Sequence, residues 1–238
     1  MLTHAKLGYS LEIMEGGYVP KTGAFFVQEL SGCEIAGKDV IDIGTGETGI
    51  LAIQAASMGA RKVIGLDIDD KAVEWARRNS EANGLSNIEF LSCDMREYMP
   101  VDKFDVIISN PPQMPVAANN SAHNDGGTDG KEYMHYIFDF ALKHLKDDGK
   151  IFLTSLDFLG IDRSYSSGPS LAAYAQERGF GLSIVGRQEK IIKEGSYTAE
   201  NLGWIRRQYP DYVFEKGEDS HLGYEICIVL AQRIQAVS

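Results

Sequence analysis

The sequence lacks long apolar runs and contains few cysteines. No stretch of about 18 consecutive apolar residues occurs, which excludes an ordinary membrane-spanning helix. No apolar segment follows a basic start near the N-terminus, so we expect no secretory signal peptide. The three cysteines, Cys33, Cys93 and Cys227, are widely spaced and form no Cys-x-x-Cys pair, which argues against a disulfide framework or a zinc site. We therefore expect a cytoplasmic protein with reduced thiols and no membrane partner.

The sequence also contains fewer basic than acidic residues. The 238 residues include 23 Lys and Arg against 34 Asp and Glu, which gives a net charge of −11. A chain of this charge is repelled by phosphate backbones and by anionic membranes, so nucleic acid is disfavoured as a partner. Hydrophobic residues make up 44% and charged residues 24%, the balance of an ordinary globular domain with a sizeable core.

From residue 38 onwards, short β-branched runs alternate with longer amphipathic stretches. Strands are expected at 39–43, 62–66, 88–92, 104–109 and 151–155, and helices at 49–58, 70–83 and 131–146. The last of these helices is expected to bury an apolar face made of Met134, Ile137, Phe138, Ala141, Leu142 and Leu145. Such alternation predicts an α/β fold with a Rossmann-like, doubly wound and mostly parallel sheet.

The C-terminal part continues this pattern with a longer interruption. Helices are expected at 170–178 and 198–208, and strands at 182–185 and 226–231, the last strand being antiparallel. We predict an N-terminal cap segment over 1–38 and one Rossmann-like domain over 39–238, with a substrate-side insertion at about 186–223. The aromatic residues of this insertion could either stack nucleobases or pack the insertion onto the sheet, and its small net charge favours packing; they are Tyr197, Trp204, Tyr209, Tyr212 and Phe214.

A glycine-rich segment, Asp42-Ile43-Gly44-Thr45-Gly46-Glu47-Thr48-Gly49, occupies the first strand-to-helix junction. Glycines at this spacing make a tight turn and let backbone N–H groups approach a ligand. Asp67 ends the next strand, where a carboxylate can accept both hydroxyl protons of a ribose, although a helix N-cap is the alternative role. Asp94-Met95 follows the third strand, where the carboxylate can accept from an adenine amino group.

The segment Asn110-Pro111-Pro112-Gln113 follows the fourth strand. The carboxyl ends of parallel strands are where open α/β sheets bind ligands. Two prolines fix the backbone and remove two N–H donors, which leaves the Asn110 side-chain oxygen and the Pro111 carbonyl as a rigid pair of acceptors. Such a pair suits an NH2 group, because it holds both protons and leaves the nitrogen lone pair to point elsewhere.

Taken together, these motifs resemble the class I S-adenosylmethionine-dependent methyltransferases. Within that class the sequence is similar to the HemK-like, small-domain enzymes that methylate the glutamine amide of translation release factors. The helix segment Ala76-x-x-Asn79-x-x-x-Asn83-Gly84-Leu85 and the loop Asp125-Gly126-Gly127-Thr128-Asp129-Gly130 match patterns of these enzymes, and Tyr18 to Thr22 matches their entrance loop loosely. The likeness covers about residues 18 to 155. Gln113 replaces the family's aromatic residue, which leaves the planarity of the target open.

This resemblance implies an N-methyltransferase that uses S-adenosyl-L-methionine and acts on a protein glutamine amide. It implies catalytic roles for Asn110 and Pro111 and substrate contacts for Pro112 and Gln113. The implied cofactor-binding residues are Asp42, Gly44, Thr45, Gly46, Gly49, Asp67, Ile68, Asp94, Met95 and Asn110. No metal site is expected, because His123, His135 and His144 lack a second ligand at metal-binding spacing.

Three other functions are compatible with parts of the sequence. An N-methyltransferase could act instead on an exocyclic amino group of RNA or DNA, or on a small-molecule amine. A nicotinamide-dependent dehydrogenase would use the glycine loop but would leave Asn110-Pro111-Pro112 unexplained. A non-catalytic cofactor-binding scaffold would have no use for the intact Asn-Pro-Pro turn. The sequence does not predict an oligomeric state.

Overall fold

The computed structural model describes residues 2–4, 9–13, 21–117, 124–216 and 221–235. The chain divides into two compact units, which are described separately: Met1–Asn110 with Phe140–Phe152, and Pro111–Asp139 with Leu153–Ser238. Two elements, α4 (Glu132–His144) and β7 (Leu145–Leu156), each contribute residues to both units. Among the described residues, no helix combines the length and the apolar character needed to cross a membrane.

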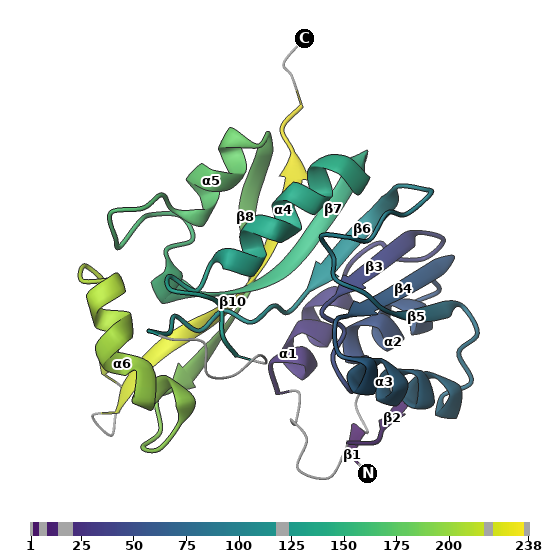
Figure 1. Cartoon of the computed structure of the whole chain (residues 1–238), viewed down its shortest axis with the longest axis horizontal. Helices are drawn as coiled ribbons and strands as arrows, with labels where there is room; N and C mark the ends of the chain where they lie inside the picture. Colours follow the sequence, from purple (N-terminus) through teal and green to yellow (C-terminus); the bar gives the residue numbers. More distant parts are fainter. Residues whose placement is uncertain (1, 5–8, 14–20, 118–123, 217–220, 236–238) are drawn as a thin grey trace. The chain divides into compact units, whose positions relative to one another are not determined.

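The first unit is built on a parallel sheet whose strands run in the order β5-β4-β3-β6-β7 (Figure 1). Its elements are β1 (Leu2–His4), β2 (Tyr9–Leu11), α1 (Lys21–Leu30), β3 (Asp39–Ile43), α2 (Ile50–Ser57), β4 (Lys62–Asp67), α3 (Asp70–Ala82), β5 (Ile88–Ser92) and β6 (Phe104–Ser109). Val40 of β3 lies between Val63 of β4 and Val106 of β6. All five residues of β3 are buried, as expected for a strand covered on both faces.

The helices of this unit begin and end where the local sequence predicts. The side chain of Asp69 caps α3 by accepting a 2.9 Å hydrogen bond from the Lys71 N–H. Gly84 follows the helix with φ of 67°, a left-handed conformation that glycine adopts without strain. α2 is buried on nearly every side and packs against β3 and β4, which explains its almost wholly apolar sequence.

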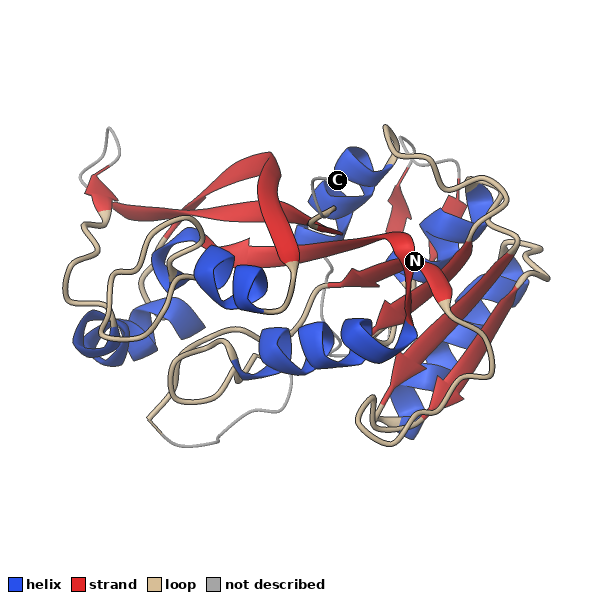
Figure 2. Ribbon diagram, turned by 90° about the horizontal axis from the view of Figure 1, so that it is seen from above, coloured by secondary structure: helices blue, strands red, loops and turns tan. Residues whose placement is uncertain are grey.

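The second unit is dominated by two long antiparallel strands, β8 (Phe180–Ile191) and β10 (Leu222–Arg233) (Figures 1 and 2). The shorter elements are η1 (Asp157–Leu159), α5 (Leu171–Glu177), α6 (Tyr197–Gln208) and β9 (Glu215–Lys216). β10 lies between β7 and β8 in the strand order, and β9 also pairs with β10. An aromatic core surrounds the buried Phe158, whose ring lies within 6.2 Å of the rings of Tyr209, Tyr212, Phe214 and Tyr224.

The expected fold class is confirmed: a mostly parallel sheet alternating with helices ends in an antiparallel strand. Three details of the expectation are wrong. β7, β8 and β10 each span 12 residues and are much longer than predicted. Since β8 continues to Ile191, the connection to β10 begins later than residue 186. Leu142 is 41% exposed and lies outside the buried face of α4. The predicted boundary at residue 38 stays a prediction.

Candidate active site

The glycine loop between β3 and α2 is held against the end of β4. Gly44, Gly46 and Gly49 have φ of 73°, 64° and 60°, so three of the loop's six residues adopt the left-handed conformation that glycine allows. The backbone N–H groups of Gly44 and Thr45 both donate to the Leu66 carbonyl, at 2.8 and 3.0 Å. These bonds explain why this segment forms a tight loop and not a longer strand.

The Asp42 side chain lies under the loop and accepts hydrogen bonds from residues within and after it. This side chain is wholly buried, and Oδ2 accepts hydrogen bonds from the Thr45 hydroxyl at 2.7 Å and from the Ala52 N–H at 3.1 Å. Oδ1 is also buried and has no hydrogen-bond partner in the described part of the chain. Burial raises the pKa of Asp42 to about 7, and the nearby charge of Asp67 adds to the rise. Thr45 is itself buried, so the structure places both residues inside the loop.

The space beside the loop is open. A Cβ atom built on Gly44 or Gly46 would meet no heavy atom within 4 Å. On Gly65 of β4, by contrast, a Cβ would lie 2.4 Å from the Phe90 ring, so that glycine is required by packing. The open space therefore adjoins Gly44 and Gly46, where the backbone groups of the loop can approach a ligand.

Asp67 lies at the end of β4, next to the loop. One carboxylate oxygen accepts from the Gly46 N–H at 2.8 Å, and the other accepts from the Asp69 N–H at 3.1 Å. The alternative role of Asp67 as a helix N-cap is wrong, because Asp69 caps α3. The following residue, Ile68, is 71% exposed, an unusual exposure for a large apolar side chain beside an open space.

Asp94 and Met95 follow β5 and are both half-buried. The Asp94 carboxylate already has a partner in this structure, since the backbone N–H and the Nε of Arg96 both donate to Oδ1 at 2.9 Å. This ion pair holds the pKa of Asp94 below its ordinary value. Any other group that bonds to the Asp94 carboxylate must therefore share it with Arg96.

Asn110 is the last residue of the first unit and follows β6 directly. Before it, the Ser109 hydroxyl donates to the Ile43 carbonyl at 2.7 Å, which braces the end of β6 against β3. Asn110 is half-buried. The strand end that carries the Asn110 side chain is thus rigidly held within its sheet.

Pro111 to Gln113 open the second unit, and Gln113 braces the Pro-Pro turn from within. Gln113 is only 8% exposed, and its Oε1 accepts from the Leu156 N–H at 2.8 Å. Its Nε2 donates to the Thr154 hydroxyl at 2.9 Å and to the Pro111 carbonyl at 3.4 Å. We expected Gln113 on the substrate side; the structure places it behind the turn instead, bonded to β7. Pro112 remains half-exposed.

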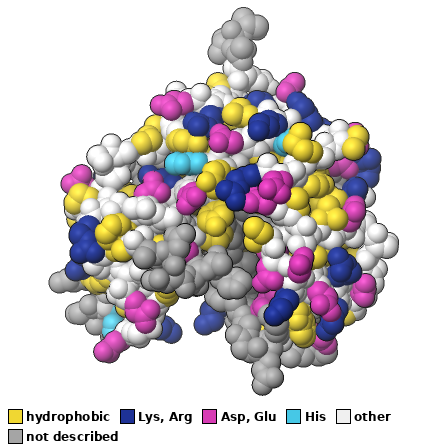
Figure 3. Space-filling view, in the orientation of Figure 1, with side chains coloured by type: hydrophobic (Ala, Val, Ile, Leu, Met, Phe, Trp, Pro, Cys, Tyr) yellow, Lys and Arg dark blue, Asp and Glu magenta, His cyan; other side chains and the backbone are white. Residues whose placement is uncertain are grey.

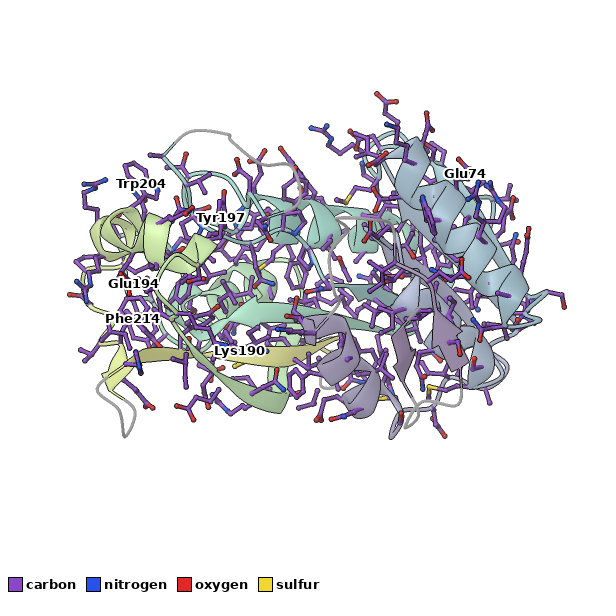
Figure 4. All side chains as sticks on the ribbon, turned by 90° about the horizontal axis from the view of Figure 1, so that it is seen from below. Glu74, Lys190, Glu194, Tyr197, Trp204 and Phe214 are labelled. Atoms are coloured by element: carbon purple, nitrogen blue, oxygen red, sulfur yellow. The ribbon has the colours of Figure 1, made fainter. Side chains whose placement is uncertain are left out.

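The described part of the Asp125–Gly130 segment is tied to residues that follow the Pro-Pro turn. The Gly126 N–H donates to the Met114 carbonyl at 2.9 Å, and the Val116 N–H donates to the Gly127 carbonyl at 3.1 Å. Two aromatic side chains of the α6 region hold the same segment: Trp204 Nε1 donates to the Thr128 carbonyl at 3.0 Å, and the Tyr209 hydroxyl donates to the Asp129 carbonyl. Figure 4 shows Trp204 and Tyr197 on α6.

Three of the five late aromatic residues pack within the second unit, as the small net charge of their segment favoured. Tyr209 is 1% exposed and Phe214 is 8% exposed, and both contact the ring of Phe158. Tyr212 donates its hydroxyl proton to the Asp157 carboxylate at 2.6 Å. The packing interpretation is confirmed for these three residues.

His135 and His144 lie in aromatic surroundings. The His135 ring stacks on that of Tyr174 with a centroid separation of 3.8 Å, and burial lowers the pKa of His135. His144 lies against Phe140. His123 falls outside the described residues. Among the residues that the structure describes, no group of three His, Cys, Asp or Glu side chains is placed to hold a metal ion.

Sequence reasoning missed the role of Asn79. This side chain is 1% exposed, and its Oδ1 accepts from the Glu12 N–H at 2.7 Å while Nδ2 lies 3.3 Å from the Thr48 carbonyl, to which it donates. Asn83 makes a matching pair of bonds to the backbone of Ser10. The two asparagines thus join α3 to the N-terminal segment, and Asn79 also joins it to the glycine loop. The signal in the sequence was the amide side chain of Asn79, which stands at a helix position that the apolar pattern of its neighbours predicts to be buried.

Comparison with known proteins places this geometry in context. A family model described as Ribosomal protein L11 methyltransferase (PrmA) matches residues 20–112. The chain resembles methyltransferases in both sequence and fold. The release factor glutamine methyltransferase of Fusobacterium nucleatum is 27% identical over 224 residues, which cover 84% of this chain and 60% of that protein. Its counterpart from Aliivibrio fischeri is 31% identical over 149 residues, which cover 60% of this chain and 51% of that protein.

The ribosomal protein L11 methyltransferase of Pseudomonas putida is 40% identical over 89 residues, which cover 37% of this chain and 30% of that protein. Among solved structures, the 16S rRNA N2 G1207 methyltransferase of Thermus thermophilus, in complex with AdoMet and guanosine, has a TM-score of 0.56 at 17% identity, over 93% of this chain and 45% of that one. The L11 methylase of Lactobacillus delbrueckii has a TM-score of 0.54 at 19% identity, over 92% and 81%. The expected resemblance to methyltransferases is thus confirmed, while the chain spans only 60% and 51% of the two release-factor relatives.

Proposed function

We propose that the chain is an S-adenosylmethionine-dependent N-methyltransferase that modifies a glutamine side-chain amide of a protein. The observation that carries this proposal is the Asn110-Pro111-Pro112 turn at the braced end of β6. The similarity of the chain to two proteins named release factor glutamine methyltransferase supports the choice of an amide as the target.

The residues of the first unit fit such a cofactor. The open space beside Gly44 and Gly46 admits a ligand close to the backbone, and the buried, unpartnered Oδ1 of Asp42 lies beneath the same loop. In our proposal the Gly44–Gly49 loop holds the amino-acid part, Asp67 holds the ribose hydroxyls, and Ile68, Asp94 and Met95 face the adenine. When bound, the cofactor supplies an electrophilic methyl group on a sulfonium with a neutral thioether as leaving group.

Asn110 and Pro111 orient the target nitrogen. An amide nitrogen is a poor nucleophile because its lone pair is delocalised over the carbonyl. The Asn110 side-chain oxygen and the Pro111 carbonyl accept hydrogen bonds from its two N–H groups, which favours a pyramidal nitrogen with its lone pair directed away from both acceptors. Holding the reacting groups in line can lower a barrier by about 7–11 kcal/mol at best. A proton leaves the nitrogen after the N–C bond has formed, so no strong base is required beforehand.

The charge of the chain supports a protein substrate. The net charge is −11, and acidic and basic side chains are interspersed over the face shown in Figure 3. A phosphate backbone would need a concentrated basic surface. A translation factor as substrate places the reaction in the cytoplasm, in line with the three free cysteines.

A labelling experiment tests the proposal. The purified chain is incubated with radiolabelled S-adenosylmethionine and, in separate reactions, a translation release factor, total RNA and a pool of small amines. We expect label in the release factor and a mass increase of one methyl group on a glutamine, with Asn110→Ala as the inactive control. Label confined to RNA or to small amines would instead support the alternative acceptors, and label in none of the three would contradict the proposal.

A further inference from the structure

The strand β8 forms one end of the sheet. In the strand order of the described sheet, β10 is its one neighbour. An edge strand presents a row of backbone N–H and C=O groups that another strand can pair with, and natural proteins usually keep such strands short. β8 spans 12 residues, so it offers an unusually long edge.

The exposed face of β8 has a defined side-chain pattern. Exposure alternates along the strand, and the exposed positions are Gly181, Ser183, Val185, Arg187, Glu189 and Ile191. Val185 and Ile191 are 42% and 53% exposed. Arg187 and Glu189 lie between these two apolar side chains. An apolar residue therefore flanks a charged pair on each side.

Among the described residues of β8 and β10, one arginine of this face lies beside two glutamates. Arg187 Nη1 donates to the Glu225 carboxylate of β10 at 2.5 Å, with half of the arginine side chain exposed. Glu189 lies directly opposite the same Glu225 in the β8–β10 register. Like charges directly opposite each other destabilise an antiparallel pair. A second cation near Glu189 would relieve this repulsion.

We propose that β8 pairs antiparallel with β8 of a second copy of this chain, about a two-fold axis at Gln188. In that register each residue faces the one equally far from Gln188 on the other strand. Arg187 then lies opposite the partner's Glu189, and Glu189 lies opposite the partner's Arg187. Val185 lies opposite the partner's Ile191, and the reverse pair forms at the other end. The pattern is self-complementary, as a two-fold interface requires.

The backbone of β8 permits this register. The one irregularity in its pairing with β10 falls between Gly186 and Ile184, so Gly186–Ile191 is a regular stretch. When a two-fold axis passes through one residue, every second residue of a strand faces an equivalent residue of the partner strand. The residues whose backbone groups point outward are then the same on both strands, so both can supply hydrogen bonds to the shared ladder. Val185 lies at the rim of this stretch, where its side chain covers the end of the ladder.

The test is the oligomeric state of the purified chain, measured by sedimentation equilibrium from about 1 to 100 µM. We expect a concentration-dependent dimer. Glu189→Arg places two like-charge pairs in the interface and should raise the dimer dissociation constant about tenfold or more. Within one chain the new arginine faces Glu225, so this variant should keep its fold, as circular dichroism would show. Arg187→Glu should weaken the dimer similarly.

The double variant Arg187→Glu with Glu189→Arg restores opposite charges across the axis and should restore the dimer. The matched control is Glu89→Arg, a glutamate at an exposed position on the edge strand β5, which should leave the dimer unchanged. A chain that stays monomeric at about 100 µM would overturn the proposal and leave the β8 edge to a different protein. A dimer that ignores both single changes, or that the double change fails to restore, would also overturn it.

Discussion

The carboxylate of Asp67 accepts a hydrogen bond from the backbone N–H of Gly46 at 2.8 Å. The end of β4 therefore holds the middle of the loop that follows β3. A residue proposed to bind a ribose also shapes the loop proposed to bind the rest of the same cofactor. Loss of its carboxylate should affect both contacts at once.

Asp67→Ala should accordingly weaken S-adenosylmethionine binding by about 10- to 100-fold for each ribose hydrogen bond lost, since a hydrogen bond to a charged group contributes about 1.5–3 kcal/mol. Isothermal titration calorimetry measures the change. Asp69→Ala is the matched control: it removes the cap of α3, should cost about 1 kcal/mol of stability, and should leave the affinity unchanged. Equal losses of affinity in the two variants would contradict a direct role for Asp67.

Asn110→Ala should leave cofactor affinity within a few-fold of the wild type and reduce kcat about 10²–10³-fold, by analogy with the loss of one oxyanion-hole donor. The contact of the Asn110 oxygen with the target NH2 strengthens as the nitrogen becomes pyramidal, so its loss acts on kcat. Asn110→Asp keeps an acceptor oxygen but adds a charge near the sulfonium, and should fall between alanine and the wild type. Initial rates of methyl transfer, measured with radiolabelled S-adenosylmethionine, test this order of activities. Wild-type turnover by Asn110→Ala would reduce the motif to a strand-ending turn.

Asp42→Asn should change how stability depends on pH. In the folded chain the pKa of Asp42 is raised from 3.8 to about 7, so the folded state holds this proton more tightly than the unfolded state. Its contribution is present in full below pH 3.8 and is lost as the pH rises through about 7, by roughly 4 kcal/mol at most. Asparagine mimics the protonated acid. Urea unfolding should therefore show the variant to be more stable than the wild type at pH 8.5 and similar to it at acidic pH.

Two glycines should separate binding from folding. Gly46→Ala places a methyl group in open space, with a backbone strain of about 1–2 kcal/mol at its positive φ, and should abolish cofactor binding while the fold survives. Gly65→Ala drives a methyl group into the Phe90 ring and should cost about 1–3 kcal/mol of stability. Thermal melts and calorimetry on both variants test the contrast. Undiminished binding by Gly46→Ala would place the cofactor elsewhere.

The parallel half of the sheet could be predicted from sequence because its signals agree with one another. β3, β4 and β6 each carry a short apolar, mostly β-branched run, and the glycines and capping acids between the strands mark the ends of the helices. β8 escaped such reasoning over half its length. Its residues from Gly186 to Lys190 include no apolar residue other than glycine, and none of them is buried, so no apolar period identifies a strand there.

The candidate site residues lie at the strand ends to which the sequence assigned them, while their binding and catalytic roles stay a prediction. The residues at the ends of β3, β4, β5 and β6 fall where their order in the sheet requires. What Gln113 does was hidden, because nothing in a turn sequence indicates that an amide is turned inward to bond with Thr154 and Leu156. The bond between Asp94 and Arg96 was equally hidden, since two residues apart in a loop is not a spacing that implies contact.

The route of the chain between its two units has a consequence for synthesis on the ribosome. The first unit requires residues up to Phe152, and residues 111–139 of the second unit are made before that point. Neither unit is a continuous stretch, so neither can complete its core as soon as its first residues emerge. During synthesis, the Pro-Pro turn and α4 lack their packing partners in the second unit until β8 and β10 have been made. Truncation between Phe152 and Leu222 leaves the second unit without β10 and should therefore yield an aggregation-prone product and not a smaller enzyme.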